Sequence, residues 1–191
     1  MCEEVALALM SERLLFNGKG NGNERASRTR GPAKVLLVRS TEERLRSRQQ
    51  VRLGAATTEQ DWREDEAQRL VVETELGVDE TKAQKMLDTL RDRREQLGLE
   101  LYLARDGAIL VGAIARFRLP AQPSCARLQE VDVFPSWRGQ GYGDALLAAM
   151  LEVLAHEGSR TVLVGADEDD WPLNWYRRRG FHDSARVPLT R

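Results

Sequence analysis

The fold is decided by residues 131–143, which read VDVFPSWRGQGYG. Val131 and Val133 alternate with polar residues as far as Pro135, a pattern typical of the end of a strand. Glycines follow at every second position, and a run with apolar residues at helical spacing comes next. The local order is therefore strand, glycine loop and helix. The apolar residues of that helix are Leu147, Met150, Leu151 and Leu154.

This order is suited to binding a phosphate group. A helix N-terminus presents unpaired N–H groups and the positive end of the helix dipole. Glycines allow a ligand to approach the backbone closely, and Arg138 adds a donor fork that matches phosphate oxygens. The spacing fits neither the G-x-G-x-x-G fingerprint of dinucleotide-binding folds nor the P-loop. The sequence thus predicts a pyrophosphate cradle of another type.

Composition places the chain among globular proteins of one domain. It has 191 residues, of which 41% are hydrophobic and 31% charged, and its net charge of −1 gives no sign of a nucleic-acid or membrane partner. Cys2 and Cys125 lie far apart, which argues against a disulfide framework or a zinc site and fits a reducing cytoplasm. His156 and His182 are interpreted as surface or packing residues.

The N-terminal part of the chain differs from the rest. Residues 1–33 contain an apolar run too short to span a membrane and then a stretch rich in Gly, Asn, Ser and Arg, so we expect a flexible tail. The folded domain is predicted over residues 34–191. Residues 34–39 and 51–56 are both candidate strands, the second being preferred as the first strand of the main sheet. A short charged helix is expected between them, through Gln50.

Helices and strands then alternate in a readable order. The Asp106-Gly107 pair is a strong turn signal and joins two apolar runs into a β-hairpin. The first helix is expected to bury Trp62, Ala67, Leu70 and Val71. Together these elements predict an α/β fold with a mixed sheet of six to seven strands and helices on both faces. Helices are expected over residues 61–76, 79–97 and 171–179, and strands over 99–105, 109–119, 126–134, 161–166 and 181–189.

Two motifs carry a resemblance to a known family. The pattern R-x-x-G-x-G, formed by Arg138, Gly141 and Gly143 after the strand, closely resembles the acetyl-CoA-binding motif of the GNAT superfamily of N-acetyltransferases. Residues 175–181, WYRRRGF, resemble the motif that closes that fold, one helix and one strand further on. The resemblance covers roughly residues 51–191. It implies a mostly antiparallel sheet that splays between its fourth and fifth strands, with acetyl-CoA in the opening.

The resemblance also implies roles for individual residues. The backbone of Val131 and Val133 would pair with the pantetheine, and Asp169 falls where many members have an asparagine or aspartate near it. Tyr176 matches the tyrosine that protonates the leaving thiolate, and this role is preferred to that of a packing aromatic. The residues expected to hold the pyrophosphate are Arg138, Gly139, Gln140, Gly141, Tyr142 and Gly143.

The general base is where the sequence departs from the family. The position of a common family glutamate, six residues before Val133, is occupied by Arg127. Glu130 and Asp132 are the candidate bases, and a water relay is an equal alternative. Simple strand alternation places both carboxylates on the face opposite Arg127 and Gln129.

The resemblance therefore implies an N-acetyltransferase that moves an acetyl group from acetyl-CoA to a primary amine of a small molecule or a protein. Direct transfer in a ternary complex is expected, because neither motif contains a cysteine. The alternative is a non-catalytic acyl-CoA sensor or partner-binding module on the same fold, which the departure at Arg127 leaves open. An RNA-associated role of the arginine-rich tail is disfavoured, because no aromatic residues are interleaved there. The acceptor and the oligomeric state, including a homodimer, stay open.

Overall fold

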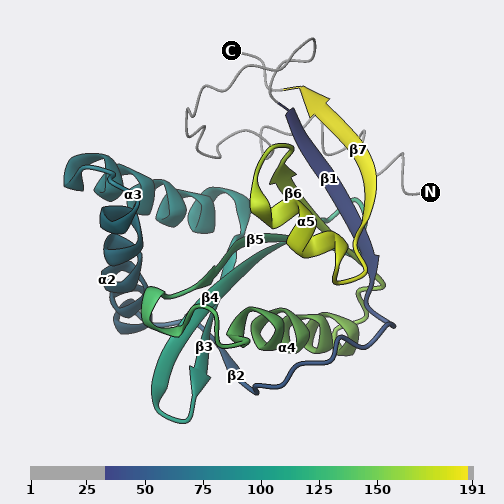
Figure 1. Ribbon diagram of the computed structural model, residues 1–191, viewed down its shortest axis with the longest axis horizontal. Coiled ribbons are helices and arrows are strands. Elements are labelled where there is room, and N and C mark those ends of the chain that lie inside the picture. Colours follow the sequence, from purple (N-terminus) through teal and green to yellow (C-terminus); the bar gives the residue numbers. More distant parts are fainter. Residues whose placement is uncertain (1–32, 189–191) are drawn as a thin grey trace. The chain divides into compact units, whose positions relative to one another are not determined.

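The computed structural model describes residues 33–188 and contains seven strands and four α-helices within that range (Figure 1). The chain divides into two compact units. Ser40–Val162 forms the larger one, and residues 33–39 and 163–188 are the described part of the smaller one. The mixed α/β class and the mostly antiparallel strand pairing predicted from the sequence are confirmed. Among the described residues, no helix combines the length and apolar character needed to cross a bilayer.

The larger unit is built on four antiparallel strands in the order β2-β3-β4-β5. The predicted Asp106-Gly107 turn joins β3 to β4, with Gly107 at a φ of 60°. Eight consecutive residues of β4 are buried, so both faces of this sheet are covered rather than one. The strands are β2 (Arg52–Ala55), β3 (Glu100–Asp106), β4 (Ile109–Arg118) and β5 (Cys125–Val133).

Three helices cover these strands. In Figure 1, α2 (Glu59–Glu75) and α3 (Glu80–Leu97) lie together on one side of the sheet and α4 (Tyr142–His156) lies against the other. Local signals set their ends: Thr58 caps α2 through a capping box, and α3 begins after Asp79 and ends at Gly98 with a φ of 64°. The two helices expected over residues 61–76 and 79–97 are therefore confirmed, the first beginning two residues earlier than expected.

The buried side of α2 differs in part from the one expected, because Trp62 is buried as predicted but Ala67 and Val71 are not. Val71 is 49% exposed and Ala67 is exposed as well. The charged side chains of Asp65 and Arg69 are buried instead, because partners on β5 and on α2 itself compensate their charges. The residues buried along α2 are Trp62, Asp65, Arg69 and Val72.

The helix expected between the first two strands is absent. Thr41 donates its hydroxyl to the carbonyl of Ser159, beyond the end of α4, and Gln49 donates to the carbonyl of Gln140, before its start. The 15 residues of α4 span about 22 Å. Eight residues in a helix would cover only about 12 Å, whereas an extended chain covers about 26 Å. The two anchors therefore require an extended segment.

The smaller unit contains three strands in the order β6-β1-β7. These are β1 (Ala33–Ser40), β6 (Thr161–Asp167) and β7 (His182–Pro188), and α5 (Trp171–Arg177) connects β6 to β7. β1 pairs antiparallel with β7, from Ala33 opposite Pro188 to Val38 opposite His182. Both candidate strands of the N-terminal region are thus real, and β2 opens the sheet of the larger unit. The predicted flexibility of the tail concerns residues outside the described range, except for Ala33.

Candidate functional site

The glycine loop connects β5 to α4 as predicted. The chain leaves β5 at Val133, forms one turn of 3-10 helix (η2, Pro135–Trp137), and reaches Gly139 and Gly141 with φ values of 73° and 92°. Residues with side chains rarely adopt these angles. Gly141 is the N-cap of α4, and no side chain caps this helix. The N–H groups of the first turn are therefore not satisfied by a capping side chain and can receive an anion.

Arg138 lies at the start of the loop. Its Nε donates to the carbonyl of Val133 at 3.0 Å, and its Nη1 lies 3.2 Å from a carboxylate oxygen of Glu75 at the end of α2. Both side chains of this ion pair are largely exposed. The guanidinium is thus held by a weak surface pair beside the loop. The Val133 carbonyl, predicted to pair with pantetheine, accepts this hydrogen bond.

Tyr142 has a structural contact that sequence reasoning did not foresee. Its hydroxyl donates to Asp106 at 2.6 Å, and its ring packs edge-on against Trp137 at 5.8 Å between centroids. The hydrogen bond to the Asp106 carboxylate, together with burial, raises the pKa of Tyr142. The side chain therefore ties the glycine loop to the β3–β4 turn, and only its backbone could serve a ligand at the helix terminus.

Gln49 is a second neighbour of the loop, and no sequence pattern pointed to it. Its Nε2 donates to the Gln140 carbonyl at 3.2 Å, and a Cβ added at Gly141 would lie 3.6 Å from its Cγ. Gln140 in turn donates to the carbonyl of Ser136 at 2.9 Å. The loop is thus braced on the protein side by the extended segment that replaces the expected helix.

A bulge in β5 changes the direction of the candidate bases. The pairing with β4 shifts by one residue between Gln129 and Asp132, and Glu130 has a φ of 50° within the bulge. Asp132 is paired with Ala113 and Gln129 with Ala115, so the two share one face of the sheet. The prediction that Asp132 lies opposite Gln129 and Arg127 is therefore wrong, because an inserted residue reverses the alternation.

β4 approaches the bulge closely. A Cβ added at Gly112 would lie closer to the carbonyl oxygen of Asp132 than real side-chain contacts allow. Glycine is therefore required at this position for the two strands to remain together. The backbone on which Asp132 is presented is fixed from the β4 side.

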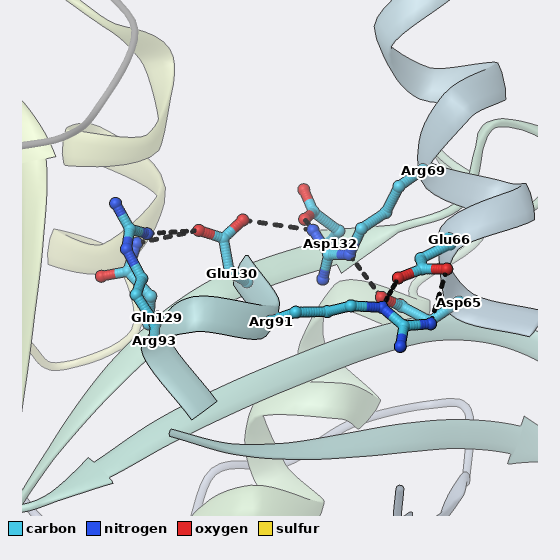
Figure 2. Close-up of polar contacts among 8 residues, drawn as sticks. All are labelled: Asp65, Glu66, Arg69, Arg91, Arg93, Gln129, Glu130 and Asp132. Carbon is cyan, nitrogen blue, oxygen red and sulfur yellow. Dashed lines mark hydrogen bonds and ion pairs between the residues drawn. The ribbon is translucent and has the colours of Figure 1, made fainter. Parts of the chain in front are cut away.

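The carboxylates of Glu130 and Asp132 meet at one guanidinium (Figure 2). Nη1 of Arg69 lies 3.1 Å from Glu130 and 2.7 Å from Asp132. The second oxygen of Glu130 lies 3.5 Å from Nη1 of Arg93, on α3, and accepts from Gln129 at 3.0 Å. The structure thus brings the two predicted bases together, with a cation from α2 between them.

Asp65 is the fully buried member of this cluster. Its side chain accepts from Nε of Arg69 at 2.7 Å. Burial raises the pKa of the Asp65 carboxyl, and the charge of Arg69 opposes that rise. Burial alone would lower the pKa of Arg69, but Asp65, Asp132 and Glu130 outweigh it and the pKa lies above its ordinary value. Arg69 therefore stays charged at any ordinary pH.

Arg127, at the position of the family glutamate, is buried over the ring of Phe117 at 5.7 Å. Its Nη2 donates to Gln129 at 3.1 Å. Burial, with a contribution from Arg93, lowers the pKa of Arg127 to about 10. Even so, the guanidinium is protonated near neutral pH and does not act as a base there.

Tyr176 belongs to the smaller unit. It is buried on α5, and its ring packs edge-on against Trp175 at 4.9 Å and Phe181 at 5.3 Å. These contacts fix the orientation of the ring, which both a packing role and a catalytic role require. Its role as an acid stays a prediction.

The acidic run before α5 is largely engaged within the smaller unit. Asp167 lies 3.2 Å from Lys34, Glu168 holds Arg186 with both oxygens, and Asp170 caps α5. Asp169 is exposed. Of the four acids, Asp169 is thus the one that these contacts leave to the solvent, and its assignment to pantetheine stays a prediction.

Asp65 and Arg69 are the residues of the cluster that sequence reasoning missed. A charged residue on a helix is ordinarily interpreted as exposed. One signal was available: the two lie at i and i+4 with opposite charges, at helical spacing from Trp62 and Val72. A charged pair in register with the apolar residues of a helix can indicate a buried ion pair.

Comparison with known proteins identifies the fold. The sequence profile described as Acetyltransferase (GNAT) family matches residues 60–181, more than half of the chain. A conserved protein of unknown function from Staphylococcus epidermidis is 16% identical, with a TM-score of 0.61, 81% of this chain and 59% of that chain being covered. A GCN5-related N-acetyltransferase from Sphaerobacter thermophilus is 21% identical, with a TM-score of 0.56 and coverages of 83% and 50%.

A third solved structure, a tandem GNAT protein from the clavulanic acid biosynthesis pathway, is 22% identical with a TM-score of 0.57. The match covers 84% of this chain and 53% of that one. At these identities the likeness shows the fold alone, and the chain spans between half and three fifths of the length of these three proteins. No curated protein matches the sequence.

Proposed function

Because the chain belongs to the acetyltransferase (GNAT) family, we propose that it transfers an acetyl group from acetyl-CoA to a primary amine of a small molecule or a protein. The observation that carries this proposal is the glycine loop before α4. It combines two glycines at positive φ, a helix N-terminus without a capping side chain, and an arginine at its start. These are the features that a pyrophosphate needs.

The residues of the loop fit acetyl-CoA as the acetyl donor. A Cβ at Gly139 would meet nothing within 4 Å, so the space beside the backbone is open. The N–H groups from Gly139 to Gly143 and the guanidinium of Arg138 would hold the pyrophosphate. By the family resemblance, Val131, Val133 and Asp169 would hold the pantetheine. Bound acetyl-CoA supplies a thioester carbonyl and a thiolate leaving group.

Acetyl transfer to an amine also requires two proton movements by the protein. The acceptor must lose a proton to become nucleophilic, and we assign this step to the Glu130–Asp132 pair, directly or through water. Both carboxylates are partly accessible on β5. The hydroxyl of Tyr176 would share its proton with the departing sulfur, as the family resemblance implies.

Arg127 favours a second candidate function. A guanidinium stands where the family often has a catalytic glutamate, which is compatible with a non-catalytic acyl-CoA sensor. The two functions differ in turnover. A sensor would bind the cofactor without releasing free thiol when amines are supplied.

The deciding experiment measures CoA binding by calorimetry and thiol release from acetyl-CoA over a panel of amines and amine-bearing peptides. We expect the protein to bind CoA and to release thiol from acetyl-CoA only when an amine is present. One of the amines should gain the mass of an acetyl group. Binding without release from any amine would favour the sensor. Failure to bind CoA at all would refute both.

A further inference from the structure

The charged cluster around Glu130 and Asp132 contains a buried arginine, Arg69, whose burial needs an explanation. Arg69 is 8% exposed at its side chain, and the carboxylate that accepts from its Nε, Asp65, is 0% exposed. Removing both charges from water is costly, and a well-packed apolar pair would often stabilise a helix interface as well. Structural need alone therefore does not explain why an ion pair occupies this part of α2.

The guanidinium extends beyond Asp65 to the two candidate bases. One nitrogen, Nη1, bridges Asp132 at 2.7 Å and Glu130 at 3.1 Å (Figure 2). Asp65 thus fixes one edge of the guanidinium while the other edge faces β5. The geometry links a buried anchor to carboxylates whose side chains are 34% and 26% exposed.

Like charges as close as these two carboxylates repel each other, and without a cation one of them would take up a proton more readily. Charged groups reach them from each neighbouring element: Asp65 and Arg69 from α2, Arg93 from α3, and Arg127 through Gln129 on β5. Arg69 contacts both carboxylates, and its charge favours the ionised form of the pair.

We propose that Arg69 is a positioning residue, which holds Glu130 and Asp132 ionised and oriented at the β5 bulge so that the pair can take a proton from the acceptor ammonium. The proposal rests on the proposed amine acetylation. In this step an N–H bond of the ammonium breaks, an O–H bond forms on one carboxylate, and the nitrogen keeps the electron pair with which it attacks. Arg69 itself exchanges no proton and acts through the carboxylates.

The test replaces the buried pair as a whole. Asp65→Asn with Arg69→Met removes both buried charges together, so that no lone carboxylate is left in the interior. We expect kcat to fall about tenfold or more. The acidic limb of the pH profile of kcat/KM should move up by about one unit or more, and CoA affinity should stay within about twofold. Arg69→Lys with Asp65 unchanged keeps a positive charge beside the carboxylates. It should therefore retain part of the wild-type pH profile.

Arg91 provides the matched control. It extends from α3 to Glu59 and Glu66 on α2, and Figure 2 shows its contact with Glu66. Neither Glu130 nor Asp132 is among its ion pairs. Arg91→Met should lower the melting temperature without moving the pH profile. A shift of equal size in Arg91→Met, or no shift in the double variant, would overturn the positioning role.

A second readout separates this proposal from the proposed function. Carboxyl-carbon NMR can follow the titration of Glu130 and Asp132 in the wild type and in the double variant, with no turnover required. A midpoint that rises by about one unit or more for at least one of them supports the role of Arg69 even if no acceptor is acetylated. Unchanged midpoints refute it even if acetyl transfer is confirmed.

Discussion

At the scale of single residues, the conformation of Gly141 separates backbone strain from ligand contact. Valine there would sit at a φ of 92°, which costs about 1–2 kcal/mol for a residue with a side chain. We expect Gly141→Val to lose that much stability and, in addition, more than tenfold in CoA affinity, since its side chain would press on Gln49 and shift the loop whose N–H groups would hold the phosphates. Calorimetry and thermal unfolding measure the two effects.

Gly158, just beyond the other end of α4, has nearly the same φ of 89° and open space around it. Gly158→Val should therefore show the same loss of stability with unchanged CoA affinity. Equal affinity losses in the two variants would mean that strain, and not contact with the ligand, explains the effect of Gly141→Val.

Tyr176 can be tested with its packing left intact. Tyr176→Phe keeps the ring that contacts Trp175 and Phe181 and removes only the hydroxyl. We expect turnover to fall about tenfold to a hundredfold with little change in substrate affinity, because the proton shared with the leaving sulfur is lost. Tyr102→Phe, which removes a hydroxyl bonded to Glu100, should leave turnover unchanged. Wild-type turnover in Tyr176→Phe would make this tyrosine a packing residue.

At the scale of elements, the end of α2 would compete with the proposed cofactor for Arg138. An exposed ion pair such as Glu75–Arg138 contributes about 0.2–1 kcal/mol. We therefore expect Glu75→Gln to tighten CoA binding by up to about fivefold at low salt, with the gain disappearing at high salt. Calorimetry at two salt concentrations measures this. Glu59→Gln on the same helix makes the same charge change far from Arg138. An equal gain in CoA affinity in that variant would mean that net charge, and not the release of Arg138, explains the effect.

Element boundaries were predictable and side-chain environments were not, for a physical reason. Caps and turns such as Asp79, Gly98 and Asp106-Gly107 act through neighbours a few residues away. The buried side of α2 depends instead on partners 61 and 63 residues further along the chain. The bulge at Glu130 and the extended segment before Gln49 likewise depend on contacts that no local pattern encodes. The strand, glycine loop and helix order was predicted because the signals that define it lie in adjacent residues.

At the scale of the whole molecule, the N-terminal strand is the least expected part of the architecture. β1 lies between β6 and β7, and Leu36 and Leu37 within it are almost fully buried. The smaller unit, which carries Tyr176, is thus closed by a strand that precedes the larger unit in sequence. The predicted domain boundary at residue 34 would remove Ala33, which is 2% exposed and accepts from the N–H of Glu168.

Two truncations test whether β1 is part of the folded unit. A chain that lacks residues 1–31 keeps all of β1, and we expect it to fold and to bind CoA like the full chain. A chain that lacks residues 1–40 exposes the edges of β6 and β7, so we expect aggregation or a lower melting temperature. The peptide AKVLLVRS, residues 33–40, should restore solubility by adding the missing strand, whereas the same peptide with Leu36→Asp should not. An unchanged melting temperature after removal of residues 1–40 would show that the unit closes without β1.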